Sequence, residues 1–132
     1  MASRDGANKD EMNTALAPQA VTTTAVGTGV DISDFEEVTL VGIGDGTAEG
    51  ELRLEESDSL GSGYTAVAAA DVSGTNPSGT DNISTSLTIA KIGYIGSKQF
   101  VRANWAVHTT NGDIAAVFKL GRAKVSPVSG DA

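Results

Sequence analysis

Two strand-like segments on either side of an Asn-Gly pair constrain the fold of this chain more than any other feature. Residues 100–110 alternate apolar and polar side chains, and residues 114–120 form a largely apolar run after the pair Asn111-Gly112. Asn-Gly is typical of a two-residue type I′ turn, because both central residues of that turn need positive φ. The pattern therefore predicts a β-hairpin.

The alternation also predicts which side of residues 100–110 is buried, since successive side chains of a strand point to opposite faces. One face carries Val101, Ala103, Trp105 and Val107, and the other carries Arg102, Asn104, Ala106 and His108. We expect the first set to face the core. Trp105 is then the largest core side chain, and His108 lies on the face opposite to it.

The length of 132 residues corresponds to one domain with a single core. Only 5% of the residues are aromatic and 16 are glycine, so the core consists mainly of aliphatic side chains around one Trp and three Phe. Such a thin core favours an oligomer, because association with partner subunits adds stability. The absence of cysteine excludes disulfides and thiolate sites.

Other segments read as short strands separated by turns, and none reads as a convincing helix. Leu52 and Leu54 alternate with charged residues and are expected to point inward. The remaining predicted strands are an edge strand at 19–26, a buried strand at 38–43, a short strand at 64–67 and an alternating segment at 84–95. We expect turn chemistry at 44–46 and a flexible loop at 73–82.

Seven or eight short strands at this spacing predict an all-β fold, a single β-sandwich or jelly-roll-like domain. The sequence divides into a flexible N-terminal arm at residues 1–18, a sandwich domain at 19–124 and a C-terminal tail at 125–132. The arm is assigned because residues 1–18 are polar, show little periodicity and end near Pro18. No signal peptide or membrane helix is expected.

The formal charge of −8 is unevenly distributed along the chain. Residues 1–60 hold 13 acidic and 3 basic residues, whereas residues 61–132 hold 4 acidic and 6 basic ones. Nucleic acid is therefore a poor partner, because phosphate binding needs clustered Lys and Arg. The acidic half either keeps the chain soluble or faces a basic surface in an assembly.

Motifs of catalysis are nearly absent, and each candidate has a structural reading that we prefer. His108 is the one histidine and has no sequence neighbour that would form a nucleophile and base pair. Gly42, Gly44 and Gly46 surround Asp45 in a pattern that resembles a phosphate loop, yet no Lys-Ser/Thr and no helix follow. We predict a turn there, no cofactor and no enzymatic activity.

Carboxylates that are close in sequence are the remaining candidates for a ligand site. Two groups could offer hard oxygen ligands to Ca²⁺, although neither has the spacing of an EF-hand loop. One is Asp31, Asp34, Glu36 and Glu37, and the other is Asp45 with Glu49. We favour surface charge over a metal site for both.

Several stretches together resemble small virion proteins of tailed bacteriophages and prophages. The most specific stretch is 91–102, Lys-Ile-Gly-Tyr-Ile-Gly-Ser-Lys-Gln-Phe-Val-Arg, in which Gln99 stands where the pattern has a basic residue. The other stretches are 16–19, 29–32, 35–37, 38–43, 54–58 and 64–67. Together these stretches cover most of residues 16 to 122.

The resemblance implies a head decoration or cement protein, which sits on the outer capsid surface, commonly as a trimer, and stabilises it. The implied partner is the major capsid protein, and the implied location is the virion after synthesis in the host cytoplasm. A tail or head-to-tail connector component is an alternative. A carbohydrate-binding module or sugar-active enzyme on a jelly roll is less favoured, because such sites need aromatic platforms and Trp105 is expected to face inward.

Overall fold

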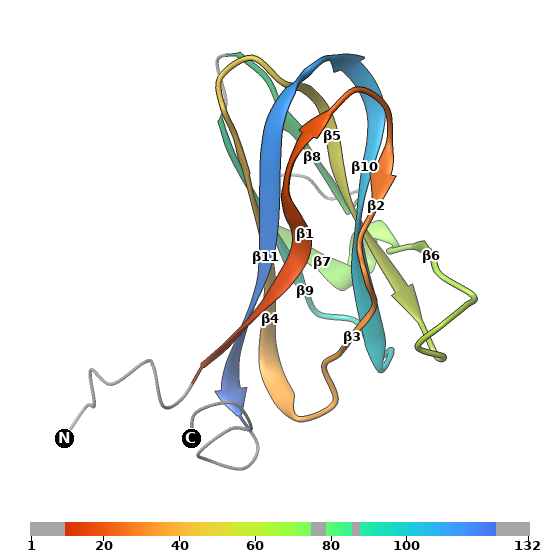
Figure 1. Cartoon of the computed structure of the whole chain (residues 1–132). Helices are drawn as coiled ribbons and strands as arrows, with labels where there is room; N and C mark the ends of the chain where they lie inside the picture. The colour runs from red at the N-terminus through yellow and green to blue at the C-terminus, as the bar shows by residue number, and fades with distance from the viewer. Residues whose placement is uncertain (1–9, 75–78, 86–87, 124–132) are drawn as a thin grey trace, which may run out of the picture.

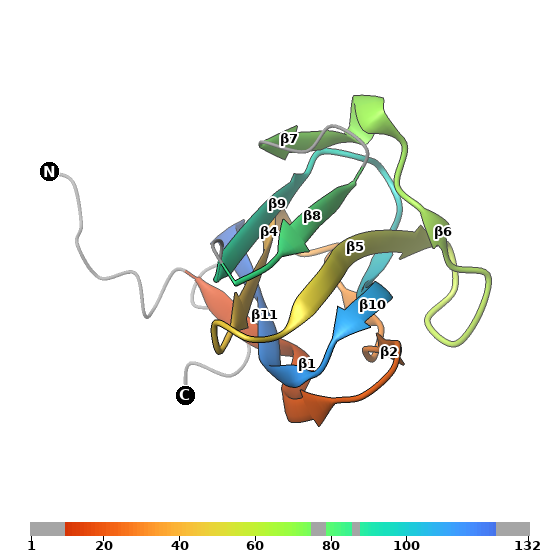
Figure 2. The same ribbon diagram turned by 90° about the horizontal axis from the view of Figure 1, so that it is seen from above.

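In the computed structural model, which describes residues 10–74, 79–85 and 88–123, two antiparallel β-sheets pack face to face (Figure 1). The view from above shows the two sheets as separate layers (Figure 2). This confirms the predicted all-β sandwich. Helical structure within the described residues is limited to a 3-10 turn at Ala69–Asp71.

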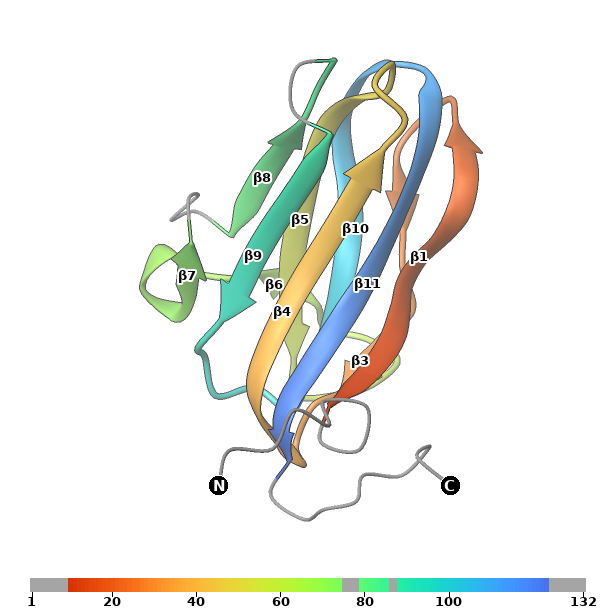
Figure 3. The ribbon, with the colours of Figure 1, turned by 90° about the vertical axis from the view of Figure 1, so that its left-hand side faces the viewer.

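The first sheet has five strands in the order β1-β11-β4-β9-β7, and Figure 3 looks onto it. Its strands are β1 (Glu11–Val21), β4 (Phe35–Gly44), β7 (Val72–Gly74), β9 (Ile89–Tyr94) and β11 (Gly112–Ala123). β4 and β11 pair over most of their length, from Ile114 opposite Gly44 to Ala123 opposite Phe35. These two long strands form the centre of the sheet.

The second sheet has six strands built around a central pair, β5 and β10. β2 and β3 pair with the free side of β10, and β6 and β8 pair with the free side of β5. The strands are β2 (Ala25–Val26), β3 (Val30–Asp31), β5 (Glu49–Ser57), β6 (Thr65–Ala66), β8 (Thr80–Ile83) and β10 (Phe100–Thr110). Both edges are therefore made of short strands.

The core lies between the sheets, where regular stretches of β4, β5 and β10 contribute every second side chain. Leu52 and Leu54 point inward from β5, as predicted. Trp105 is 0% exposed, and its indole lies so close to Gly50 that a Cβ there would be 2.5 Å from the ring. Gly50 therefore provides the space that the largest core side chain occupies.

The predicted β-hairpin at Asn111-Gly112 is wrong, although strands do flank it. β10 belongs to the six-stranded sheet and β11 to the five-stranded sheet, so the connection crosses the sandwich. Neither Asn111 nor Gly112 has positive φ. Gly112 pairs with Val21 and packs against Ala48, so pairing with distant strands outweighs the local turn preference.

The predicted flexible arm at residues 1–18 is wrong for residues 11–18, which form most of β1. This strand pairs with β11, and its side chains Ala15 and Leu16 are both buried. Register shifts on either side of Leu16 bury two consecutive residues, which hides the period of two that identifies a strand. Residues 1–9 and the predicted tail at 125–132 lie outside the described residues.

Two further expectations need correction. The loop predicted at 73–82 holds the end of β7 and the start of β8, and residues 75–78 lie outside the described residues. The strand predicted to be buried at 38–43 is part of β4, which buries only alternate side chains because one face of its sheet is uncovered. Ile43 is 53% exposed on that face.

Replacing Trp105 with alanine tests the core assignment. We expect a loss of about 3 to 5 kcal/mol in the free energy of unfolding, because the change leaves a cavity between the sheets. Chemical denaturation followed by circular dichroism measures it. The control Val26→Ala, at an exposed side chain, should change stability by less than about 0.5 kcal/mol. Equal stability of the two variants would contradict the assignment.

Candidate interaction surface

His108 does not lie opposite Trp105, as the alternation predicted, but contacts it. The indole Nε1–H of Trp105 donates to His108 Nδ1 at 3.1 Å. The cause is an irregularity in β10: pairing with β5 shifts between Ala106 and Thr110, and Val107 has φ of 47°. The alternation therefore reverses, so that Ala106 is buried and Val107 is exposed.

The hydrogen bonds of His108 identify its role. Trp Nε1 can only donate, so His108 Nδ1 accepts and Nε2 carries the proton, which it donates to Asn111 Oδ1 at 2.8 Å. The imidazole thus satisfies the one polar atom of the buried Trp105 side chain. No nucleophile takes part in this arrangement, which serves the core and the crossing from β10 to β11.

Gly42 and Gly44 lie on the inner face of β4 and do not form a phosphate-binding loop. A Cβ at Gly44 would be 2.6 Å from the Ile83 side chain of the facing sheet, so these glycines allow close packing. Gly46 has φ of 91° and completes the predicted turn between β4 and β5. The segment is therefore structural.

Asp45 holds this turn against the connection between β10 and β11. Its Oδ1 accepts from Thr47 N (2.9 Å), Thr47 Oγ1 (2.8 Å) and Ala48 N (3.1 Å), while Oδ2 accepts from Asp113 N (2.9 Å). The bonds from the backbone N–H groups of Asp113 and Thr47 lower the pKa of Asp45 well below its ordinary value of 3.8. Its carboxylate is therefore ionised at neutral pH.

Three of the other candidate carboxylates, Asp31, Glu36 and Glu37, have polar partners within the chain. Asp31 accepts a hydrogen bond from Ser33 N, and this bond lowers the pKa of Asp31. The Asp31 carboxylate also accepts a hydrogen bond from Gln99 Nε2 at 3.2 Å. Glu36 and Glu37 each lie 3.7 Å from Arg122. Within the described residues, no group of three or more His, Asp or Glu side chains could hold a metal ion.

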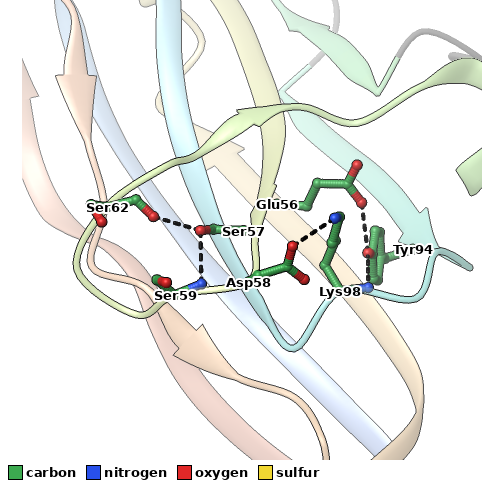
Figure 4. A network of polar contacts seen from close by, with 7 residues as sticks. All are labelled: Glu56, Ser57, Asp58, Ser59, Ser62, Tyr94 and Lys98. Carbon is green, nitrogen blue, oxygen red and sulfur yellow. Dashed lines mark hydrogen bonds and ion pairs between the residues drawn. The ribbon is translucent and has the colours of Figure 1, made fainter.

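Glu56 and Tyr94 form a buried polar contact between the sheets (Figure 4). Glu56 of β5 is 9% exposed and accepts the Tyr94 hydroxyl of β9 at 2.7 Å, while Lys98 N donates to the same hydroxyl. Burial, followed by the bond to Glu56, raises the pKa of Tyr94. Lys98 also pairs with Asp58 at 2.8 Å. The bond between Glu56 and Tyr94 therefore links the two sheets at one end of the sandwich.

The outer face of the six-stranded sheet is covered by charged side chains that pair with one another. Arg102 of β10 contacts Glu55 of β5 at 2.6 Å, and Arg53 contacts Glu51 along β5 at 2.8 Å. Arg102 also lies 4.4 Å from the centre of the Tyr64 ring. On this face, both arginines therefore already have carboxylate partners.

The outer face of the five-stranded sheet is different, because apolar residues lie opposite one another where β4 pairs with β9 and β11. Ile43 of β4 is paired with Ile89 of β9 on one side and with Ala115 of β11 on the other. In the next row, Val41 lies between Val117 of β11 and Lys91 of β9, so the basic residue marks the limit of the apolar residues there. We call Val41, Ile43, Ile89, Ala115 and Val117 the apolar face; Ile43 and Ile89 are 53% and 58% exposed.

The edges of both sheets offer less to a partner than the apolar face. β1 is the edge of the five-stranded sheet, but it has two register shifts and contains Pro18, which has no N–H. β2, within the predicted edge segment 19–26, is only two residues long. Such edges are poor templates for an added strand, so the faces carry more of the binding potential.

The sequence matches no protein-family model, and neither curated proteins nor solved structures include a significant match. No helix among the described residues is both long and apolar enough to span a membrane.

Replacing Asp45 with alanine should lower Tm at neutral pH, because four hydrogen bonds lose their acceptor. The lowered pKa of Asp45 means that its stabilisation is complete above about pH 5 and is lost as the pH falls through the folded-state pKa. The Tm gap between wild type and Asp45→Ala should therefore shrink progressively below pH 3.8. A gap that stays constant or grows in acid would contradict this account. Asp34→Ala, which removes an exposed carboxylate, is the control.

Replacing His108 with alanine should destabilise the fold by about 1 to 3 kcal/mol, because the buried indole N–H of Trp105 loses its acceptor. Urea denaturation with Trp105 fluorescence as the probe measures the change. The matched variant Asn111→Ala removes only the exposed second bond and should cost less. If both variants have wild-type stability, the hydrogen bond between Trp105 and His108 contributes nothing to the free energy of unfolding.

Proposed function

We propose that this chain is a non-enzymatic virion structural protein, a head decoration or cement protein that binds the outer capsid surface and stabilises it. The observation that carries the proposal is the contrast between the two outer faces of the sandwich. One face is covered by paired charges, whereas the other exposes adjacent apolar side chains. Contiguous exposed apolar residues mark surfaces that bind other proteins.

The apolar face suits a flat protein partner better than a small substrate. Its residues come from three neighbouring strands, and β4 at its centre pairs regularly with β11 on one side and β9 on the other. A broad apolar surface on a rigid sheet is a feature of stable protein interfaces, whose buried cores are apolar. The resemblance of residues 91–102 and the other stretches to phage virion proteins supports the major capsid protein as that partner.

The chain's shortage of core aromatics supports an oligomer, and we propose a homotrimer on the capsid. Mass action with neighbouring subunits then adds to the stability of a small sandwich. Attachment to a capsid lattice needs neither nucleic acid nor membrane. The same surface would also serve a tail or head-to-tail connector component, which is the alternative.

A carbohydrate-binding role receives no comparable support. The chain has one Trp and two Tyr. Trp105 and Tyr94 are buried, and Tyr64 lies beneath the Arg102 guanidinium. None of these rings forms an open platform on which a sugar could stack.

Attachment to phage heads tests the proposal. Purified protein should bind expanded heads that lack it and raise their resistance to heat, with density on the outer capsid surface in electron cryomicroscopy. Density confined to the tail or neck would support the connector alternative instead. The trimer is checked by sedimentation equilibrium, and a monomer at the concentration that saturates heads would contradict it.

Matched variants locate the binding face. Ile43→Glu places a charge on the apolar face and should weaken attachment at least tenfold, or about 1.4 kcal/mol. Asn82→Glu makes the same charge change on the outer face of the six-stranded sheet, where Asn82 is paired with Glu51, and should bind as wild type. Equal binding by both variants would show that the apolar face is not the attachment surface.

A further inference from the structure

A pocket with a volume of about 480 Å³ lies at one end of the apolar face. Its walls come from three strand ends: Pro18, Gln19 and Ala20 of β1, Ile43 and Gly44 of β4, and Ile114 and Ala115 of β11. The volume lies within the range of about 300 to 1,000 Å³ that is typical of ligand pockets. Because it includes Ile43 and Ala115, the pocket continues the apolar face.

The pocket coincides with an irregular part of the sheet edge. The pairing of β1 with β11 shifts register between Leu16 and Gln19, an interval that contains the pocket residue Pro18. Pro18 has no N–H to contribute to a ladder there. The depression is thus formed by backbone geometry and by small side chains, and it does not require a side chain to move.

Two carboxylates make the rim of the pocket negatively charged. Asp45 and Asp113 line it, and no Lys or Arg of the described ranges does. Asp45 is held by four hydrogen bonds and its pKa is lowered, so the charge is fixed in position at neutral pH. The Asp113 carboxylate is exposed and forms no ion pair among the described residues, so it is open to an incoming cation.

We propose that this pocket receives an apolar side chain from a segment of the capsid partner in which a lysine or arginine stands next to that side chain. The inference rests on the proposed attachment to a capsid. The apolar residue fills the space above Ile43 and Ala115, and the basic group pairs with Asp113 at the rim. An apolar anchor in a pocket supplies affinity, and a complementary rim charge supplies orientation and a faster association rate.

Charge reversal tests the rim. Asp113→Lys should weaken attachment to heads at least tenfold, whereas Asp34→Lys should change it less than twofold. Asp34 is the matched control because it is also an exposed aspartate and lies just before β4, at the opposite end of that strand. Asp113→Asn should give an intermediate loss. Equal attachment by Asp113→Lys and Asp34→Lys would overturn the proposal while leaving capsid attachment intact.

Photo-crosslinking identifies the occupant. A benzoylphenylalanine placed at Ala20, an exposed pocket residue, should crosslink on heads to a capsid segment that contains an apolar residue adjacent to Lys or Arg; the same probe at Asp34 should not. A crosslink to a second copy of this chain, to a segment without a basic residue, or to nothing while the protein stays bound would overturn the proposal. Failure of the wild-type protein to bind heads would instead overturn the proposed function on which it rests.

Discussion

The indole of Trp105 fills the space above Gly50, and its Nε1–H donates a hydrogen bond to His108 Nδ1. The five-stranded sheet packs over this inner surface, and the chain crosses to that sheet only a few residues later. The irregularity at Val107 turns His108 toward Trp105, at the point where the pairing of β10 with β5 shifts register just before the chain crosses. The same short stretch of β10 therefore determines the packing of Trp105, its hydrogen bond to His108 and the crossing of the chain between the sheets.

Local patterns in the sequence predicted individual strands better than their partners. Leu52 and Leu54 were assigned to the core because strict alternation survives wherever one face of a regular strand is buried. The β-hairpin predicted at Asn111-Gly112 is wrong because turn preference depends on local residues, whereas the pairing of β11 with β1 and β4 depends on distant ones. Residues 11–18 were missed because the register shifts around Leu16 interrupt their alternation.

The candidate surface was less accessible to sequence reasoning than the fold. Each row of the apolar face joins residues from strands far apart in the chain, such as Ile43 with Ile89 and Ala115. The buried contact between Glu56 and Tyr94 likewise joins residues 38 positions apart. The alternation of β4 could have indicated one apolar outer position at Ile43, but only the order of strands shows that its neighbours are apolar too.

The pairing of β1 with β11 places Glu11, where β1 begins, opposite Leu120, near the end of β11. A force that pulled these two neighbouring strand ends apart would break their hydrogen bonds one after another, with little resistance at any moment. A force applied through the apolar face would instead be shared by three strands and the packed core beneath them. The sandwich is therefore mechanically anisotropic, stiff under a load on its face and easily peeled from its paired ends.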